Sequence, residues 1–153
     1  YWSRFENVWF HGDYVFADED NLWYMQGRSD DVINVSGHRM STAEIEHSVI
    51  SHDKISDAAS ISIPDELTGE AIVVFFVSND ENNVDLESDV LEHISKKIGK
   101  IAKPKHIFQL SDLPKTRTGK IMRRLLKAKL LGTELGDLSS LENPEVLDEI
   151  NKL

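Results

Sequence analysis

A cationic segment that ends in a Gly-Lys pair holds the residue most capable of chemistry in this chain. Residues 114–120 read Pro-Lys-Thr-Arg-Thr-Gly-Lys without any acidic residue, and a basic, apolar stretch, residues 121–127, follows. An ammonium group on a flexible turn can be carried to a phosphate and a carboxylate at once, so Lys120 could stabilise the charge that develops between them. Taken alone, a solvated helix start explains the same charges equally well.

A P-loop is the first alternative, because a Walker A motif also ends in Gly-Lys before a helix. The first glycine of that motif would fall at Pro114, which has no N–H to offer a phosphate. Lys120 is followed by Ile121 instead of the Ser or Thr that holds magnesium. The segment is therefore not a P-loop.

Three residues upstream could hold the sugar and phosphates of a nucleotide. Asp13 offers two oxygens that can accept from neighbouring hydroxyl groups, as in a ribose diol. Arg28 and Arg39 offer planar donors for ribose oxygens or phosphate. Each also has a structural explanation, because Gly-Asp is a common turn and an Arg beside Asp30 and Asp31 commonly forms a local ion pair.

The chain of 153 residues has a formal net charge of -10, but its basic residues are concentrated. Residues 96–129 hold 12 of the 17 Lys and Arg residues and a single acidic residue, Asp112. We expect this stretch to give a local positive field that favours small polyanions such as nucleotides or coenzyme A. The acidic remainder would repel a long nucleic acid, so no nucleic-acid partner is expected.

Composition excludes several other classes of protein. The chain has no cysteine, no apolar run near 18 residues and no signal-peptide pattern, which argues against disulfides, thiolate metal sites, a membrane partner and secretion by its own signal. These features fit a cytoplasmic protein. The chain starts abruptly at Tyr1, without Met and without an element leading in, so we expect it to be a piece of a longer protein.

Short strands come first among the elements that must position these residues. Aromatic strands are predicted at residues 14–17 and 22–26, around an acidic turn. Residues 31–35 alternate towards Ser36-Gly37, which predicts a hairpin with Gly37 at a position that tolerates positive φ.

Helices and longer strands follow. Ser41 and Glu44 form a capping-box pattern, which predicts a helix to about Ser51. Its apolar face is expected to hold Ile45, Val49 and Ile50. The other predicted elements are strands at 58–63, 71–77 and 106–110, a helix between Asp85 and Gly99, and a helix from Ile121 to near Gly132. Residues 133–153 are expected to form an extended tail with one short helix after Pro144.

The order βαββαβα predicts a small domain of the α/β (α+β) class, with a central mixed β-sheet flanked by helices. At about 105 residues, such a domain is too small to enclose a two-substrate active site alone.

The order and spacing of these motifs resemble the adenylate-forming acyl-CoA synthetases. The matching residues are 23–39, then Ala43-Glu44-Ile45-Glu46, and later 114–120. Similarity is greatest to the acetyl-CoA synthetase branch of that family, at residues 42–46, 120–124 and 135–141.

The resemblance implies a division of the chain into three parts. Residues 1–29 would be a β-hairpin at the end of the N-terminal nucleotide-binding domain, with the hinge. Residues 30–133 would form the mobile C-terminal AMP-binding-enzyme domain, and residues 134–153 an acidic C-terminal tail.

The resemblance also implies a ligase that works in two half-reactions. A carboxylate and ATP give acyl-adenylate and pyrophosphate, and coenzyme A then displaces AMP to give the thioester. The implied substrates are acetate, ATP and coenzyme A. The roles implied for single residues are adenylation for Lys120, ribose diol for Asp13, ribose for Arg28, phosphate for Arg39, the hinge for Asp30, and the pantetheine tunnel for Ser36 and Gly37.

Two further sites follow from the resemblance. A basic residue that meets the 3′-phosphate of coenzyme A in the family falls here at Ser95, with Lys96 beside it. A Mg²⁺ ion held by main-chain oxygens would map to Ile50, His52 and Ile55. The other histidines show no metal-ligand spacing and are expected to be structural or solvated.

We expect a fragment that is inactive without its N-terminal domain, and two alternatives stay open. The acyl group could be another short chain such as propionate, because the acyl pocket would lie in the missing part. The chain could instead be a stand-alone regulatory or binding module, with Lys120 as the target of a lysine acyltransferase and deacylase that control its charge.

Overall fold

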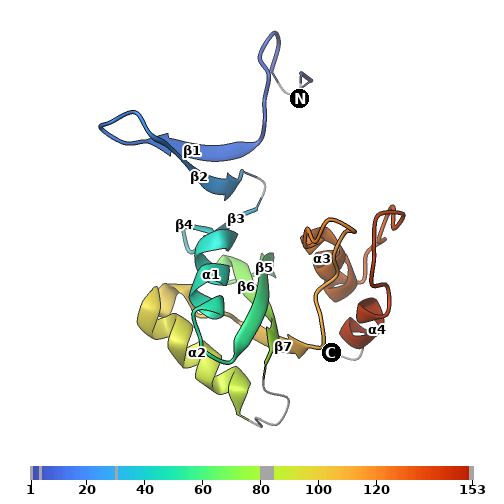
Figure 1. Cartoon of the computed structure of the whole chain (residues 1–153). Helices are drawn as coiled ribbons and strands as arrows, with labels where there is room; N and C mark the ends of the chain where they lie inside the picture. The colour runs from blue at the N-terminus through green and yellow to red at the C-terminus, as the bar shows by residue number, and fades with distance from the viewer. Residues whose placement is uncertain (1, 4, 30, 80–84, 152–153) are drawn as a thin grey trace.

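Aromatic residues near the start of the chain form an antiparallel hairpin that stands apart from the rest of the molecule (Figure 1). In this computed structural model, which describes residues 2–3, 5–29, 31–79 and 85–151, β1 (Asp13–Ala17) pairs with β2 (Trp23–Arg28). Asp18 closes the turn, because its carboxylate accepts two backbone N–H groups and, at 2.8 Å, the hydroxyl group of Tyr24. The two predicted aromatic strands are confirmed.

Large apolar side chains of this hairpin and of the segment before it are exposed. The exposed fraction is 60% for Trp9, 73% for Trp23 and 64% for Met25. Among the described residues, the hydrophobic core begins only at Ile33 and receives nothing from the hairpin. Apolar surface of this extent commonly marks an interface with another part of a protein.

A second, tighter hairpin connects β3 (Val32–Val35) to β4 (His38–Ser41) through Ser36 and Gly37. Both loop residues lie in the left-handed region, with φ of 50° at Ser36 and 85° at Gly37. A two-residue loop with positive φ at both positions is a type I′ turn, whose twist matches that of the strands. The hairpin predicted here is confirmed.

The main sheet is mixed and has five strands, with β6 (Gly69–Ser78) as its centre. On one edge β6 pairs along its whole length, in antiparallel register, with β5 (Ile55–Asp65). On the other edge Gly69 pairs with Val35 of β3, and the far half of β6 pairs in parallel with β7 (His106–Leu110). The central mixed sheet and the predicted strand at 106–110 are confirmed.

Helices cover both faces of this sheet (Figure 1). Successive side chains of β6 point to opposite faces, so Val74 packs with one core cluster and Val73 with the other. One face is covered by α1 (Thr42–Ile50) and α2 (Leu86–Lys97), which the 3₁₀ turn η1 (Lys100–Ala102) follows. The other face is covered by α3 (Arg123–Leu131) and α4 (Val146–Ile150). Burial on both faces explains why residues 71–77 form a continuous apolar run.

Helix α1 begins as predicted but exposes one residue that was expected in the core. The hydroxyl oxygen of Ser41 accepts the backbone N–H of Ala43 at 3.1 Å, which caps the helix. Ile45 and Val49 are fully buried, whereas 43% of Ile50 is exposed. The prediction for Ile50 is wrong because the residue after Val49 is rotated by about 100° from the buried stripe, and the helix ends there.

The end of the chain is more deeply packed than an extended tail would be. The short helix predicted after Pro144 is α4, and its residues Val146, Leu147 and Ile150 are all at most 5% exposed. They complete the core cluster beneath α3. Three apolar residues within little more than one helical turn were too short a pattern to predict this burial.

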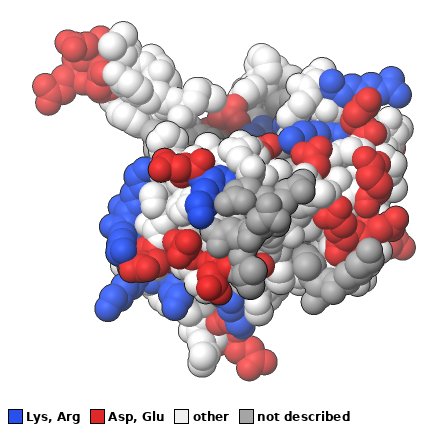
Figure 2. All heavy atoms as spheres, turned by 60° about the horizontal axis from the view of Figure 1, so that its bottom comes forward, with Lys and Arg blue, Asp and Glu red and all other residues white. Residues whose placement is uncertain are grey.

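The basic stretch 96–129 does not form one positive surface, contrary to expectation. Its first part lies on α2, η1 and the start of β7, and its second part on the Lys120 segment and α3, across the sheet. Lys96 pairs with Glu92 at 2.7 Å and Lys105 with Asp65 at 2.5 Å. Figure 2 shows the result on one face, where Lys and Arg alternate with Asp and Glu.

Among the residues that the structure describes, no helix combines the length and the apolar character that crossing a membrane requires.

Candidate functional site

The loop that carries Lys120 is a closed, hydrogen-bonded turn. The backbone N–H of Thr116 donates to the carbonyl oxygen of Lys120 at 2.9 Å, and the N–H of Lys120 donates to the hydroxyl oxygen of Thr116 at 3.1 Å. Gly119, with a φ of 80°, allows the chain to reverse. The sequence predicted a flexible turn, but hydrogen bonds hold its backbone and the long Lys120 side chain is exposed.

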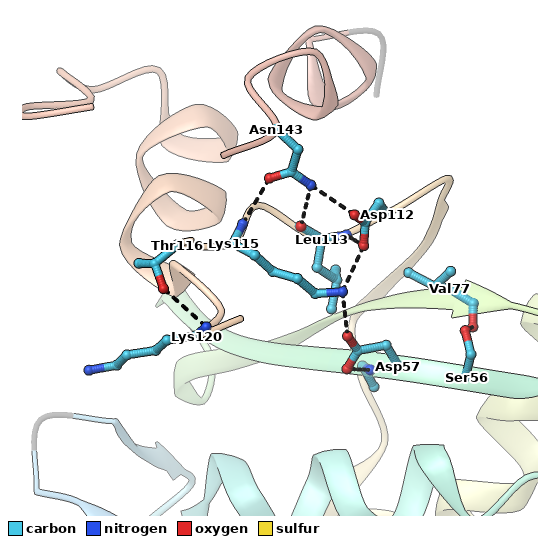
Figure 3. A network of polar contacts seen from close by, with 10 residues as sticks. Ser56, Asp57, Val77, Asp112, Leu113, Lys115, Thr116, Lys120 and Asn143 are labelled. Atoms are coloured by element: carbon cyan, nitrogen blue, oxygen red, sulfur yellow. Dashed lines mark hydrogen bonds and ion pairs between the residues drawn. The ribbon is translucent and has the colours of Figure 1, made fainter. Parts of the chain in front are cut away.

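The Lys120 ammonium is available for a ligand. Its side chain is exposed and points away from the polar contacts that hold the loop (Figure 3). In the described part of the chain, no carboxylate pairs with this ammonium. Lys115 in the same loop is the opposite case, because it forms ion pairs with Asp57 and Asp112.

A cavity of about 450 Å³ brings Lys120 and Arg28 together. It lies between the end of β2 and the start of α3, and four cationic side chains and one carboxylate line it. Its volume falls within the range of small-molecule sites, and its charge favours an anionic ligand. The residues of its wall are Arg28, Asp31, Thr116, Lys120, Ile121, Met122, Arg123 and Arg124.

Asp13 is the direct neighbour of Arg28 across the β1–β2 hairpin. One Arg28 nitrogen lies 3.5 Å from an Asp13 oxygen and donates to the His11 carbonyl at 3.3 Å, while His11 contacts the second Asp13 oxygen. A methyl group at Gly12 would come within 3.1 Å of the Arg28 guanidinium, so Gly12 permits this close approach. The two residues predicted to bind the ribose therefore lie side by side and contact each other.

Arg39 lies outside that cavity and joins the two hairpins. Its guanidinium donates to the hydroxyl group of Tyr14 at 3.1 Å and lies 5.9 Å from the centre of the Tyr14 ring. This polar and cation-π contact connects β4 to β1.

Ser36 and Gly37 also lie away from the Lys120 cavity, at the tip of the β3–β4 hairpin. The backbone N–H of Ser36 donates to the carbonyl oxygen of Thr68 at 2.9 Å, which ties the tip to the β5–β6 turn. A methyl group at Gly37 would meet no described atom within 4 Å, so open space adjoins the glycine. Lys120 and Arg28, which were predicted for ATP, line the cavity, whereas Ser36 and Gly37, which were predicted for coenzyme A, do not. Arg39, also predicted for ATP, lies on the same hairpin as Ser36 and Gly37.

The predicted hinge residue, Asp30, lies outside the described residues. Its neighbours are placed: the N–H of Ser29 donates to the carbonyl oxygen of Gly12 at 2.8 Å, and Asp31 borders the Lys120 cavity.

The carbonyl groups proposed for Mg²⁺ belong to Ile50, His52 and Ile55, between α1 and β5. The His52 carbonyl accepts the N–H of Ile55 at 3.0 Å and has a second lone pair. Carbonyl oxygen is a ligand type that magnesium accepts, so the chemistry of these donors is compatible with the ion. In the described part of the chain, no three His, Asp or Glu side chains gather into a metal site.

The His52 side chain belongs to a small polar cluster between α1 and α2. Its ring lies 5.3 Å from that of His93, edge to face, and His93 contacts the Ser51 hydroxyl at 2.9 Å. Burial, followed by the nearby His52 and Lys97, lowers the pKa of His93. The side chains of His52 and His93 thus contact each other, and His93 also contacts Ser51. Lys96 on α2 is exposed and paired with Glu92.

Sequence reasoning missed the ion pair that fixes the wall of the cavity. Arg123 donates to both oxygens of Glu46, with Nε–Oε1 of 2.8 Å and Nη2–Oε2 of 2.6 Å. Glu46 also accepts the backbone N–H of Ser60 at 2.8 Å, on the outer edge of β5. The hydrogen bond to Glu46 raises the pKa of Arg123, although burial opposes it. An acidic residue beside the buried face of α1 was the available signal, but its partner lies 77 residues away.

We expect Glu46→Ala to lower the free energy of unfolding by about 3 kcal/mol. The change leaves the half-buried Arg123 guanidinium without its carboxylate and the Ser60 N–H without an acceptor. Urea unfolding of the variant measures the loss. Glu44→Gln, at an exposed position of the same helix, keeps the capping-box pattern and is the control; it should cost less than about 0.5 kcal/mol. Equal effects of the two changes would contradict the importance of this ion pair.

The chain is similar to proteins of known name and structure. Residues 44–120 match the model of the AMP-binding enzyme C-terminal domain. The chain is 43% identical over 152 residues to an acetyl-coenzyme A synthetase of Methanothrix thermoacetophila, covering 98% of this chain and 23% of that protein. It is 44% identical over 154 residues to an acetyl-coenzyme A synthetase of Emericella nidulans, with the same coverage of 98% and 23%. The chain thus spans about a quarter of the length of these relatives.

Solved structures agree with the fold. A fatty acyl CoA synthetase of Mycobacterium tuberculosis superposes with a TM-score of 0.67 at 31% identity, over 82% of this chain and 25% of that chain. An anthranilate CoA ligase in complex with anthranoyl-AMP gives 0.68 at 32% identity, over 77% and 23%. Sequence and fold together place this chain in the family of AMP-binding enzyme C-terminal domains, found in adenylate-forming ligases.

Proposed function

We propose that the chain is the C-terminal part of an AMP-forming acetyl-CoA synthetase. The observation that carries the proposal is the shared cavity of Lys120 and Arg28, with the Ser36-Gly37 turn on a separate surface. Such a layout suits an enzyme that needs a cation in one half-reaction and a different surface in the other. The identity of about 43% to proteins named acetyl-coenzyme A synthetase supports acetate as the carboxylate.

In the first half-reaction, an acetate oxygen attacks the α-phosphorus of ATP, and pyrophosphate leaves. Two anions must approach each other, so the Lys120 ammonium lowers the barrier by binding both oxygen atoms as charge develops, an effect of about 3 to 4 kcal/mol for one such donor. Asp13 accepts from the ribose hydroxyl groups, Arg28 donates to the ribose, and Arg39 donates to phosphate. Mg²⁺, when bound by the main-chain oxygens of residues 50, 52 and 55, would supply positive charge outside the Lys120 cavity.

In the second half-reaction, the thiol sulfur of coenzyme A attacks the acetyl carbonyl carbon, and AMP leaves. Lys120 is not needed for this step, because the phosphate and carboxylate are no longer being joined. Rotation about Asp30 would withdraw Lys120 and bring Ser36 and Gly37 against the pantetheine chain. The open space at Gly37 suits a narrow channel wall.

The remaining partner is the N-terminal domain of the same protein. The exposed aromatic side chains of the β1–β2 hairpin and the segment before it provide an apolar surface for that domain to cover. We place the acyl pocket and the adenine pocket in that N-terminal domain, so the 153-residue chain should be inactive alone. A lysine acyltransferase could reach the exposed Lys120 side chain, and acylation would remove the charge on which the first half-reaction depends.

Acetate-dependent release of pyrophosphate, followed by formation of AMP and acetyl-CoA, tests this function in the full-length protein. We expect the full-length protein to convert acetate faster than propionate and the 153-residue chain alone to show no turnover. Faster conversion of propionate would reassign the acyl group. Turnover by the chain alone, or no turnover with any short carboxylate, would contradict the proposal.

A further inference from the structure

Asn143 binds the segment that leads into the Lys120 loop at three points. Its side-chain oxygen accepts the backbone N–H of Lys115 at 2.9 Å. Its side-chain nitrogen donates to the carbonyl oxygen of Leu113 at 2.8 Å and to the carboxylate of Asp112 at 2.9 Å. One amide side chain therefore holds the chain on both sides of Pro114 (Figure 3).

The two residues before Asn143 extend this contact along the loop. The N–H of Glu142 donates to the carbonyl oxygen of Lys115 at 2.9 Å, and Leu141 forms an antiparallel bridge with Thr116. Lys115 in turn bridges to Ile121, so residues 141–143 lie beside the loop as a third strand lies beside a hairpin. Thr116 is the residue that exchanges two hydrogen bonds with Lys120.

The Lys115 side chain fixes the same segment to the main sheet. Its ammonium lies 2.9 Å from Asp57 on β5 and 2.8 Å from Asp112. Its hydrogen bond to Asp112 raises the pKa of Lys115 despite partial burial. Burial alone would raise the pKa of Asp112, but the hydrogen bonds from Lys115 and its other donors lower it. The pair is therefore charged at neutral pH and anchors the loop electrostatically.

The far side of residues 141–143 is equally well fixed. Val146, three residues after Asn143, is buried in the core. Before residues 141–143, the guanidinium of Arg124 on α3 binds the carbonyl oxygens of Leu135 and Asp137. Residues 141–143 thus connect a rigid core element to the loop, and their hydrogen bonds reach Lys120 through Lys115 and Thr116.

We propose that residues 141–143 form a clasp that positions Lys120 for the first half-reaction, with Asn143 as its central positioning residue. The inference rests on the proposed function, because it concerns the same lysine. The clasp sets the backbone from which the Lys120 ammonium reaches its ligand. Small displacements of a reacting group by about 1 Å can cost on the order of 100-fold in rate. Among the described residues, the hydrogen bonds of the Asn143 side chain and the Glu142 N–H are with residues 112–115, and none is with the Ser36-Gly37 turn.

The test is Asn143→Ala in the full-length protein, with both half-reactions measured separately. We expect acetyl-adenylate formation to fall by about 10- to 100-fold in kcat. KM for ATP and the rate of thioester formation from supplied acetyl-adenylate should each change by less than about threefold. Asn151→Ala is the matched control, because Asn151 also lies at the end of the chain but binds Lys129 on α3 at 2.9 Å instead of the loop. It should leave both half-reactions unchanged.

A double-mutant cycle separates positioning from a general loss of stability. If Asn143 acts through Lys120, adding Asn143→Ala to Lys120→Ala should not lower the residual adenylation rate further. A further tenfold loss in the double variant, or an equal loss in both half-reactions, would overturn the clasp. Full activity of Asn143→Ala beside an inactive Lys120→Ala would also overturn it while leaving the proposed function intact. Full activity of Lys120→Ala would instead overturn the proposed function.

Discussion

Lys120→Ala in the full-length protein should lower the rate of acetyl-adenylate formation by about 10²- to 10³-fold. The substitution removes a cation that lines the cavity and is carried by a hydrogen-bonded loop. Among the described residues, no carboxylate pairs with the Lys120 ammonium. Thioester formation from supplied acetyl-adenylate should stay within about threefold of the wild type, because no carboxylate attacks phosphorus in that step. Pyrophosphate release measures the first half-reaction, and AMP release the second.

Two further variants show whether the position or only the charge of Lys120 matters. Arg117→Ala removes a cation from the same loop, but Arg117 faces Glu142 at 3.5 Å and does not line the cavity, so both half-reactions should be retained. Lys120→Arg keeps the charge on a wider, planar group that cannot follow moving charge as a compact ammonium does, and should recover only part of the rate. Equal loss of both half-reactions in Lys120→Ala would contradict the assignment.

Gly37→Leu should impair the second half-reaction and spare the first, the reverse of the result expected for Lys120→Ala. The space beside Gly37 is open in this chain, so a branched side chain would project where the pantetheine chain is proposed to pass. We expect thioester formation to fall by about 100-fold, through displacement of the attacking thiol, and adenylate formation to change by less than about threefold.

Backbone strain is the competing explanation for a Gly37 variant. At a φ of 85° any side chain at this position costs free energy, of the order of 1 to 2 kcal/mol. Gly37→Ala carries nearly the same strain with little bulk, so it should lose much less thioester activity than Gly37→Leu. Similar losses in the two variants would show that strain, and not obstruction of a channel, is responsible. Separate rate measurements of both half-reactions for each variant distinguish backbone strain from obstruction of the channel.

Local chemistry made several elements predictable. The Ser36-Gly37 turn is a two-residue loop whose glycine accepts positive φ, and the Ser41 cap needs only residues of its own helix. The strand that became β6 was visible as an apolar run because both of its faces are buried. The cavity shared by Lys120 and Arg28 was not predicted, because 92 residues separate them and the resemblance of the motifs assigned each only a role in binding or activating ATP.

Contacts between distant segments could not be predicted in the same way. Glu46 and Arg123 pair across 77 residues, and Asn143 and Lys115 across 28. A single acidic residue or asparagine carries no sign of which distant partner it will meet. The basic stretch 96–129 was also misleading, because a sequence does not show that α2 and α3 lie on opposite faces of a sheet. Which distant side chains contact each other depends on the topology of the fold, and local sequence patterns define that topology only in part.

The separation of the β1–β2 hairpin from the hydrophobic core determines how much free energy a change in the angle between this hairpin and the main sheet would cost. The contact of Arg39 with Tyr14 is exposed, and an exposed hydrogen bond contributes only about 1 kcal/mol, little more than thermal energy. No described apolar side chain of the hairpin would have to leave the core if the angle between the hairpin and the sheet changed. The energy landscape for this angle should therefore be shallow, so that occupancy of the nucleotide site, and not the chain's own packing, selects which orientation is populated.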